Sequence, residues 1–385
     1  MTIASRMDNI APFHVMALLA RARELESQGR DIVHMEIGEP DFSTPERITE
    51  AAVVALRQGH THYTPALGLS SLRQGIADFY QSHYGVTLPA SRVVVTPGSS
   101  GALQLIMGVL VNPGQQVIMA DPGYPCNRHF VELMGGEACL VPVDGRSQYQ
   151  LTAEMVDAHW NDQSVAVMLA SPSNPCGTLI DEQELRAIVE LVEGRGGVVI
   201  VDEIYHGLVY DQHPQTAAAI SDKLFVVNSF SKFFAMTGFR VGWLITPPAY
   251  LDAIDRLAQN LFLAPSTPAQ YAALAALEPE SLAILEQRVK VFRERRDYLL
   301  SALPALGFRI LSQPQGAFYI YADCSAITAD SFALCEQLLE QAGVAVTPGA
   351  DFGINQPGIH LRFAYTTDLA RLKLGIDRIK AFLQA

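Results

Sequence analysis

From Arg92 onward, short apolar runs alternate with helical patterns along the chain. The expected strands cover residues 93–95, 116–120, 138–143, 165–170, 198–201 and 224–227. Helical patterns lie between several of them, at residues 102–110, 124–134 and 182–193. Strands that are apolar on both faces and alternate with helices are typical of a largely parallel sheet covered on both sides. We therefore expect an α/β fold.

A smaller α/β pattern follows a long helical stretch at residues 267–303, which is interrupted near Pro279. Its expected strands are 308–311, 317–321, 344–347 and 360–363, and its helices are 331–342 and 368–383. Near the N-terminus we expect an amphipathic helix at 12–29, a strand at 32–37 and a helix that begins at Thr44-Pro45-Glu46. A chain of 385 residues with two such patterns suits two domains.

Composition argues against several classes of function. A formal net charge of −13 disfavours sequence-independent binding to nucleic acid or to an anionic membrane surface. No apolar run approaches transmembrane length, and the N-terminus lacks the apolar core of a signal peptide. The five cysteines form no CxxC pair and no zinc spacing. We expect a cytoplasmic protein with reduced thiols and no metal site.

Polar residues interrupt the apolar pattern at the carboxyl ends of five expected strands. In open parallel sheets, ligands bind beyond these ends. The five segments are Gly98-Ser99-Ser100-Gly101, Asp121-Pro122-Gly123-Tyr124, Asn174-Pro175, Asp202-Glu203-Ile204-Tyr205 and Ser229-Phe230-Ser231-Lys232. Because the carboxyl ends of parallel strands meet at one edge of a sheet, these segments predict one composite site.

Lys232 stands in an aromatic environment, between Phe230 and Phe233. Desolvation would lower its pKa and make its amine a usable nucleophile. Ser229 and Arg240 supply a short donor and a forked cation, which suit a phosphate group. An amine and a phosphate clamp in one loop suggest a Schiff base to pyridoxal phosphate. The alternative is a surface loop with an ordinary lysine.

Asp202 ends a strand that should be buried. An unpaired buried charge costs about 3–5 kcal/mol, so this carboxylate needs a cation, a metal or a hydrogen-bond donor. A protonated pyridine nitrogen would satisfy it, and so would a backbone turn. Tyr205 and Asn174 could hydrogen-bond a phenolate oxygen, or they could be a core tyrosine and a turn former.

Three further groups could recognise an anion or a flat ring. The segment 98–101 precedes a helix, so its free N–H groups suit an anion. Arg362 lies in an apolar strand, where it could bind a carboxylate ligand with both arms of its fork or form an internal salt bridge. Tyr124 could stack on a planar ring or belong to the core.

Together these features resemble the class I/II aminotransferases, the aspartate aminotransferase superfamily of fold type I pyridoxal-phosphate enzymes. The resemblance covers nearly the whole chain, and its most specific part is Ser-x-Ser-Lys with Arg240 eight residues after Lys232. The other matching segments are 37–42, Tyr63-Thr64-Pro65 with Gly68, 174–177, 202–205, 315–319 and Arg362. It implies a large, mostly parallel domain at residues 47–285 and a small α/β domain made of residues 1–46 and 286–385.

The resemblance also implies a role for each matching residue. Lys232 would form the Schiff base and then carry the proton, which makes it the catalytic residue. Asp202 would pair with the pyridine N–H. The residues expected to bind pyridoxal 5'-phosphate are Ser99, Ser100, Gly101, Tyr124, Asn174, Asp202, Tyr205, Ser229, Lys232, Arg240 and Tyr63. The residues expected to bind the substrate are Gly38, Tyr124, Asn174 and Arg362.

The implied reaction moves the amino group of an L-amino acid to a 2-oxo acid, with 2-oxoglutarate as the family's usual acceptor and ping-pong kinetics. In this family the counterpart of Tyr63 reaches the phosphate of the neighbouring subunit, which implies a homodimer with shared sites. Two alternatives share the fold: a carbon–sulfur β-lyase and a regulatory ligand-binding protein.

Substrate identity is weakly encoded. A dicarboxylate specialist needs a second cation, and some aspartate-specific bacterial relatives have a lysine in the loop where this chain has Ser99-Ser100. The segment 10–16 is mostly apolar and is expected to line the side-chain pocket. Both features favour neutral amino acids.

Overall fold

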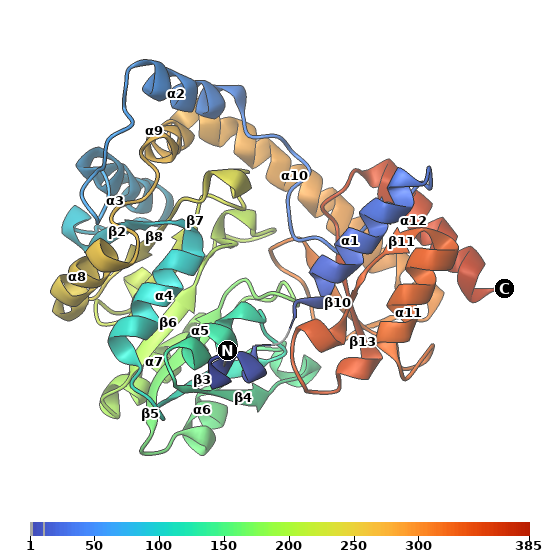
Figure 1. Ribbon diagram of the computed structural model, residues 1–385. Coiled ribbons are helices and arrows are strands. Elements are labelled where there is room, and N and C mark those ends of the chain that lie inside the picture. Colours follow the sequence, from blue (N-terminus) through green and yellow to red (C-terminus); the bar gives the residue numbers. More distant parts are fainter. Residues whose placement is uncertain (1–2, 11) are drawn as a thin grey trace.

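The computed structural model describes residues 3–10 and 12–385 and has two lobes (Figure 1). The larger lobe contains a seven-stranded sheet in the order β2-β8-β7-β6-β5-β3-β4. Strand β8 is antiparallel to both neighbours, whereas the other adjacent pairs are parallel. The strands are β2 (Val93–Thr96), β3 (Gln116–Asp121), β4 (Glu137–Pro142), β5 (Ser164–Ala170), β6 (Val198–Asp202), β7 (Phe225–Ser229) and β8 (Gly242–Ile245). The expected mostly parallel α/β sheet is therefore confirmed.

Helices cover this sheet because its central strands are apolar on both faces. Every residue of β6 and β7 is buried, including the polar ones at their carboxyl ends. The helices of this lobe are α2 (Glu46–Arg57), α3 (Ser70–Tyr84), α4 (Gly98–Leu110), α5 (Cys126–Leu133), α6 (Ala153–His159), α7 (Glu182–Gly194), α8 (Leu251–Leu261) and α9 (Thr267–Ala276). The buried strand ends are thus the places where polar groups can meet a ligand.

The smaller lobe contains a four-stranded sheet in the order β12-β13-β10-β9, with antiparallel pairs. Its elements are β9 (Arg309–Ile310), β10 (Tyr319–Asp323), α11 (Ser331–Gln337), β12 (Thr347–Pro348), β13 (His360–Ala364) and α12 (Leu369–Leu383). Near the N-terminus, α1 (His14–Ser27) precedes β1 (Val33–His34), which pairs with β11 (Val344–Ala345). Helix α10 (Pro279–Ala302) runs from one lobe to the other (Figure 1). The domain boundaries at residues 46/47 and 285/286 stay a prediction.

Several local expectations need correction. Helix α4 begins at Gly98 rather than at Ala102, so the segment 98–101 forms its first turn. Helix α5 begins at Cys126, which leaves Tyr124 in the preceding loop. The expected strand at 344–347 divides into β11 and β12, because the first part pairs with β1 and the second with β13. Helix α8 forms where no element was expected.

No helix in the described ranges 3–10 and 12–385 is long and apolar enough to cross a membrane. The cytoplasmic location stays a prediction.

Candidate active site

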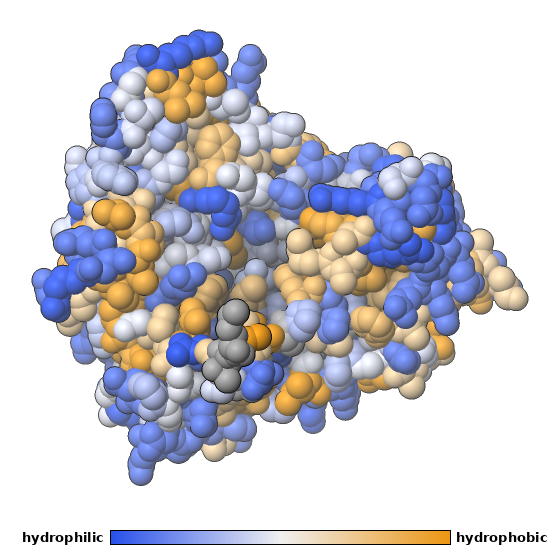
Figure 2. Space-filling model, viewed as in Figure 1, coloured by the Kyte–Doolittle hydropathy of each residue, from blue (hydrophilic) through white to orange (hydrophobic). Residues whose placement is uncertain are grey.

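A cavity of about 310 Å³ opens at the carboxyl edge of the large sheet. This volume is typical of small-molecule sites. Figure 2 shows apolar surface around α1 beside the hollow between the lobes. Most of the predicted site residues line the cavity: Gly38, Ser99, Ser100, Tyr124, Asn174, Asp202, Tyr205, Lys232, Arg240 and Arg362. The strand ends therefore meet as expected.

Lys232 lies in the loop that joins the antiparallel neighbours β7 and β8. Its Nζ donates a hydrogen bond to the Gly38 carbonyl oxygen at 2.7 Å, so it faces the segment that follows β1. Burial lowers the pKa of the Lys232 amine to about 8, with the nearby Glu39 carboxylate opposing part of that shift. A fraction of the amine is therefore unprotonated near neutral pH, as a nucleophile requires.

Asp202 ends β6, and it is buried and lines the cavity. Its Oδ1 accepts the backbone N–H of Ile204 at 3.0 Å. Burial raises the pKa of Asp202 to about 6, although the hydrogen bond from the Ile204 N–H and the charge of Lys232 each act to lower this pKa. The backbone-turn alternative is thus present, but it uses Oδ1 only. A cationic N–H in the cavity would stabilise the carboxylate further.

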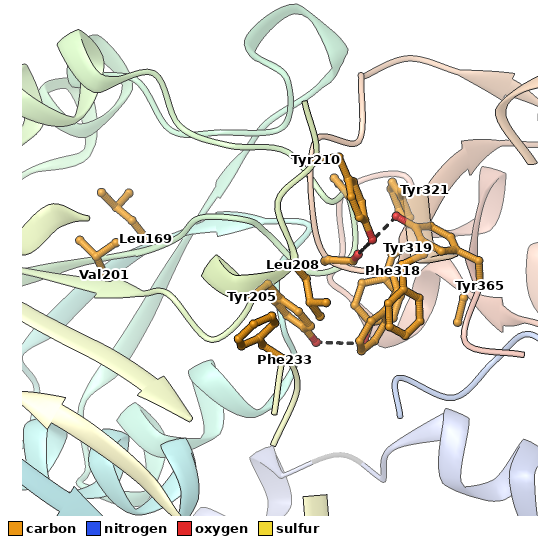
Figure 3. Close-up of a cluster of buried hydrophobic side chains, with 14 of the residues drawn as sticks. Leu169, Val201, Tyr205, Leu208, Tyr210, Phe233, Phe318, Tyr319, Tyr321 and Tyr365 are labelled. Atoms are coloured by element: carbon orange, nitrogen blue, oxygen red, sulfur yellow. Dashed lines mark hydrogen bonds between the residues drawn. The ribbon is translucent and has the colours of Figure 1, made fainter. Parts of the chain in front are cut away.

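Tyr205 donates to or accepts from a partner that the sequence did not reveal. Its hydroxyl lies 2.9 Å from the Tyr319 hydroxyl, and the two rings meet edge to face (Figure 3). Burial raises the pKa of both hydroxyls, so both stay neutral hydrogen-bond donors. The pair joins the loop after β6 to β10 of the smaller lobe. Gly38 packs against it so closely that a Cβ there would lie 1.9 Å from the Tyr319 oxygen.

Arg362 on β13 is buried, yet among residues 3–10 and 12–385 all of its hydrogen-bond partners are uncharged. Its guanidinium donates to Asn174 Oδ1 at 3.0 Å, to the Glu36 carbonyl oxygen at 2.5 Å and to Thr347 Oγ1 at 3.3 Å. Its Nε has no partner among residues 3–10 and 12–385. These contacts do not support the internal salt bridge that was the alternative. A buried, lining guanidinium with no carboxylate partner suits an anionic ligand.

The N-terminus of α4 and the side chain of Arg240 form a cradle for an anion. The first N–H groups of a helix have no intrahelical partners and carry positive partial charge. Gly98 has φ +69°, and a Cβ on it would lie 2.6 Å from a guanidinium nitrogen of Arg240. The guanidinium also reaches Ser231 Oγ at 3.5 Å. A phosphate fits this cradle because backbone donors and a forked cation converge on it.

Three predicted cofactor residues do not line the cavity. Gly101 is buried in α4 against Pro97. The hydroxyl of Ser229 is buried and donates to Ser231 Oγ at 2.9 Å, and it is Ser231 that lines the cavity. Tyr63 is 82% exposed, on the outside of this chain.

The apolar N-terminal segment 10–16 contributes only in part. Phe13, Val15 and Met16 line the cavity, together with Leu19 of α1. Ala11 lies outside the described residues.

Some lining residues were missed by sequence reasoning. Tyr319, Glu39 and Thr237 all face the cavity, and Thr237 Oγ1 donates to the Glu39 carboxylate at 2.5 Å. Tyr319 and Glu39 belong to segments that carried the family resemblance, and this was the available signal.

The residues present fit pyridoxal phosphate. The cradle at Gly98 would hold the phosphate, the buried Asp202 carboxylate would pair with a ring N–H, and the Lys232 amine lines the same cavity. In the part of the chain that the structure describes, no three His, Cys, Asp or Glu side chains are grouped to hold a metal ion.

Comparisons with known proteins agree with this geometry. The family description "Aminotransferase class I and II" matches residues 30–379. The chain is 38% identical to the valine–pyruvate aminotransferase of Mycobacterium tuberculosis over 97% of each chain. It is 34% identical to the (5-formylfuran-3-yl)methyl phosphate transaminase of Methanocaldococcus jannaschii over 99% of each.

Among solved structures, the crystal structure of an aminotransferase from Mycobacterium tuberculosis superposes with a TM-score of 0.96 at 37% identity. The superposition covers 100% of this chain and 99% of that one. Because these relatives are aminotransferases, the carbon–sulfur lyase alternative is not favoured. The chain therefore belongs to the class I and II aminotransferases and is a transferase enzyme.

Proposed function

We propose that this aminotransferase uses pyridoxal phosphate to move the amino group of a neutral L-amino acid to a 2-oxo acid. The observation that carries the proposal is one cavity that holds a partly buried lysine amine, a buried carboxylate and a buried guanidinium with no carboxylate partner among residues 3–10 and 12–385: Lys232, Asp202 and Arg362. When bound, the cofactor would supply an aldehyde that receives the amino group and a ring that withdraws electrons from Cα.

The side chains would divide the work by position. Lys232 would hold the cofactor covalently through Nζ and, once displaced by the substrate amine, would carry the proton that leaves Cα. Asp202 would hold the ring nitrogen in its protonated form. Tyr205 and Asn174 would hydrogen-bond the ring oxygen, and Arg362 would bind the substrate α-carboxylate. The enzyme would retain the amino group between two half-reactions, which gives ping-pong kinetics.

The amino donor that we propose has an apolar side chain. The apolar side chains of Phe13, Val15, Met16 and Leu19 line the same cavity as Lys232. Within the described residues, the only lining cations are Lys232, Arg240 and Arg362, and each already has a role. A second carboxylate on the donor would therefore find no further cation among the described residues that line the cavity. The name of the valine–pyruvate aminotransferase supports the same choice.

The acceptor that we propose is one of two 2-oxo acids. The family resemblance favours 2-oxoglutarate, and the name of the relative from Mycobacterium tuberculosis favours pyruvate. Initial rates with valine, leucine, alanine and aspartate against both acceptors rank the substrates. The proposal expects the apolar donors to exceed aspartate at least about 10-fold in kcat/KM, since an unpaired buried charge costs well over 1.4 kcal/mol.

The test of the reaction is a single half-reaction. Holoenzyme incubated with an amino donor alone should release one 2-oxo acid per site and lose its yellow absorbance. Lys232→Ala should abolish both effects, while Lys223→Ala, which changes an exposed lysine paired with Glu193, should leave them intact. Steady release of pyruvate and ammonia from cysteine, without loss of absorbance, would instead establish a lyase.

We also propose a homodimer in which Tyr63 completes the phosphate site of the partner. Tyr63, Leu261 and Leu263 are exposed by 82%, 49% and 60%. Thr267 Oγ1 donates to the His62 carbonyl oxygen at 2.7 Å, which brings the loop of Tyr63 beside the start of α9. Exposed aromatic and aliphatic side chains gathered in this way are typical of an interface between chains.

Mixed dimers test the shared site. Chains with Lys232→Ala are co-refolded with chains carrying Tyr63→Phe. If sites are shared, each mixed dimer contains one site with native Lys232 and native Tyr63, and it binds one pyridoxal phosphate with native affinity. If sites are not shared, affinity stays at the weaker value of Tyr63→Phe, about 10-fold lower for a lost charge-assisted hydrogen bond.

A further inference from the structure

The segment 349–355 of the smaller lobe touches three parts of the active site. It begins with Gly349–Asp351, a short 3₁₀ turn after β12. Asp351 is 3% exposed, and its two oxygens accept the backbone N–H groups of His14 and Val15, both at 2.8 Å. These are the first residues of α1, whose own N-cap, Phe13, makes no side-chain capping bond. Asp351 therefore caps α1 from the far end of the chain.

Helix α1 is a wall of the cavity. Val15, Met16 and Leu19 line it from the first turns of the helix, next to Phe13, whose ring meets Tyr124 edge to face. The capped turn thus lines the cavity and would face the side chain of the substrate. Loss of the cap would let this turn fray, because both N–H groups would lose their acceptor.

The residue after the cap lies against Arg362. The Arg362 guanidinium is 4.8 Å from the centre of the Phe352 ring and 4.3 Å from that of Tyr319. The Phe352 carbonyl oxygen accepts the backbone N–H of Gly123 at 2.8 Å, immediately before Tyr124. Consecutive residues therefore support the helical wall and the arginine that would bind the carboxylate.

The rest of the segment is fastened to the large sheet. Asp121 at the end of β3 accepts the backbone N–H groups of Ile354 and Asn355 at 3.0 and 3.1 Å. Residue 353 must be glycine, because a Cβ there would lie 1.5 Å from Asp121 Oδ1. A buried carboxylate with two N–H donors holds the segment in one place.

We propose that Asp351 is a positioning residue for substrate selection: it holds the first turn of α1 as the wall of the side-chain pocket and links that wall, through Phe352, to Arg362. The proposal rests on the proposed function only in assigning the substrate side chain and carboxylate to these two places. Asp351 touches neither. It acts through the backbone of α1, so its effect should grow with the size of the substrate side chain.

The kinetic test compares Asp351→Ala with Asp351→Asn and Asp368→Ala in the holoenzyme. Asp368 caps α12 through the N–H of Arg371, so its loss should cost similar stability away from the cavity. Asp351→Ala should raise KM for leucine about 5–10-fold, the effect of a lost cap of about 1 kcal/mol, with kcat within about twofold and a smaller rise for alanine. Asp351→Asn should restore part of the affinity, because its single amide oxygen can still accept one of the two N–H groups.

Hydrogen exchange supplies a readout that does not need turnover. Amides of residues 14–19 should exchange about 5–10-fold faster in Asp351→Ala holoenzyme, and should be unchanged in Asp368→Ala. Equal KM changes for leucine and alanine, or the same KM change in Asp368→Ala, would overturn the proposal. So would faster exchange throughout the chain. A wild-type enzyme that transaminates neither donor would reject the proposed function, while the exchange result would still decide the capping role.

Discussion

Burial moves the pKa values of the two central titratable residues towards each other. The pKa of Lys232 falls to about 8 and that of Asp202 rises to about 6. In both cases the largest cause is desolvation, which disfavours the charged form. A lysine poised near neutral pH can both give and take a proton, which suits a shuttle.

Arg362→Lys is expected to raise KM for the amino donor about 100-fold, with a smaller effect on kcat. A lysine is a point charge and cannot hold Asn174, the Glu36 carbonyl oxygen and a carboxylate in one plane. A loss of roughly 3 kcal/mol corresponds to that factor. Steady-state kinetics measure it. Arg371→Lys, at a surface pair with Asp31, is the control and should leave KM unchanged.

The ion pair of His34 with Glu36 predicts a pH-dependent stability. The Nδ1 of His34 lies 2.7 Å from the buried Glu36 carboxylate, and this partner raises the pKa of His34 to about 9 despite partial burial. Since the folded pKa exceeds the usual 6.5, the stabilisation is complete below about pH 6.5 and is lost as pH rises through about 9. It amounts to at most about 3 kcal/mol.

Thermal unfolding from pH 6 to 10 checks this expectation. The melting temperature of His34→Gln should lie below that of the wild type at pH 6, and the gap should narrow towards pH 10. A gap of constant size across that range would show that protonation of His34 contributes nothing.

At the scale of elements, the parallel strands were predictable and some helix starts were not. Strands β5 and β6 are continuous apolar runs, which few other structures can accommodate. Helix α4 begins with Gly98-Ser99-Ser100-Gly101, residues of low helix propensity that resemble a turn. Tertiary packing overrides that preference. Helix α8 was overlooked although Leu251, Ile254 and Ala258 have helical spacing.

Gly98→Ala tests the cradle at the start of α4. The new Cβ would meet the Arg240 guanidinium, so affinity for pyridoxal phosphate should fall about 10-fold or more, which is roughly one charge-assisted hydrogen bond. Gly114→Ala is the matched control: φ there is +80°, and in the part of the chain that the structure describes no atom lies within 4 Å of the added Cβ. Both variants should lose about 1 kcal/mol from backbone strain.

Cofactor titration of both apoproteins, followed by absorbance, separates the two effects. Equal dissociation constants for Gly98→Ala and Gly114→Ala would mean that the position of Arg240 does not matter for phosphate binding.

At the scale of the whole molecule, one ion pair fastens the segment after Gly38 to the helix that joins the lobes. Arg295 of α10 donates two hydrogen bonds of 2.8 Å to the Asp41 carboxylate. The next residue, Phe42, has the guanidinium groups of Arg288 and Arg295 at 5.0 and 5.2 Å from its ring centre. The position of the Gly38 backbone therefore depends on α10.

Asp41→Asn should lower the urea midpoint of unfolding by an amount equivalent to about 2–3 kcal/mol. It removes the charge that compensates Arg295, whose side chain is 4% exposed, although Asp41 itself is 30% exposed. Glu50→Gln is the control, since its pair with Arg57 is exposed and should contribute less than about 1 kcal/mol. Equal midpoints for the two variants would contradict this role of Asp41.

Contacts between distant parts of the chain account for what the sequence could not predict. Tyr319 hydrogen-bonds Tyr205, which lies 114 positions away in the chain, and Asp351 hydrogen-bonds His14, which lies 337 positions away. Neither Tyr319 nor Asp351 belongs to a local sequence pattern that predicts its partner. Ser229 was expected at the phosphate because it shares a motif with Lys232. The backbone path of the loop after β7 determines that Ser231, and not Ser229, lines the cavity, and this path could not be predicted from the sequence. By contrast, the meeting of polar residues at the carboxyl ends of parallel strands could be predicted, because the topology of the sheet brings these ends to one edge.

The pairing of β7 with β8 also predicts the order in which parts of the active site form during folding. The two strands are antiparallel neighbours, with Ser229 opposite Gly242, so the loop that carries Lys232 and Arg240 is closed by its own hairpin. Arg362 and the Glu36 carbonyl oxygen meet only after the chain has closed over 326 positions. Because local contacts form faster than distant ones, a refolding chain should shape its cofactor anchor well before it can bind a carboxylate.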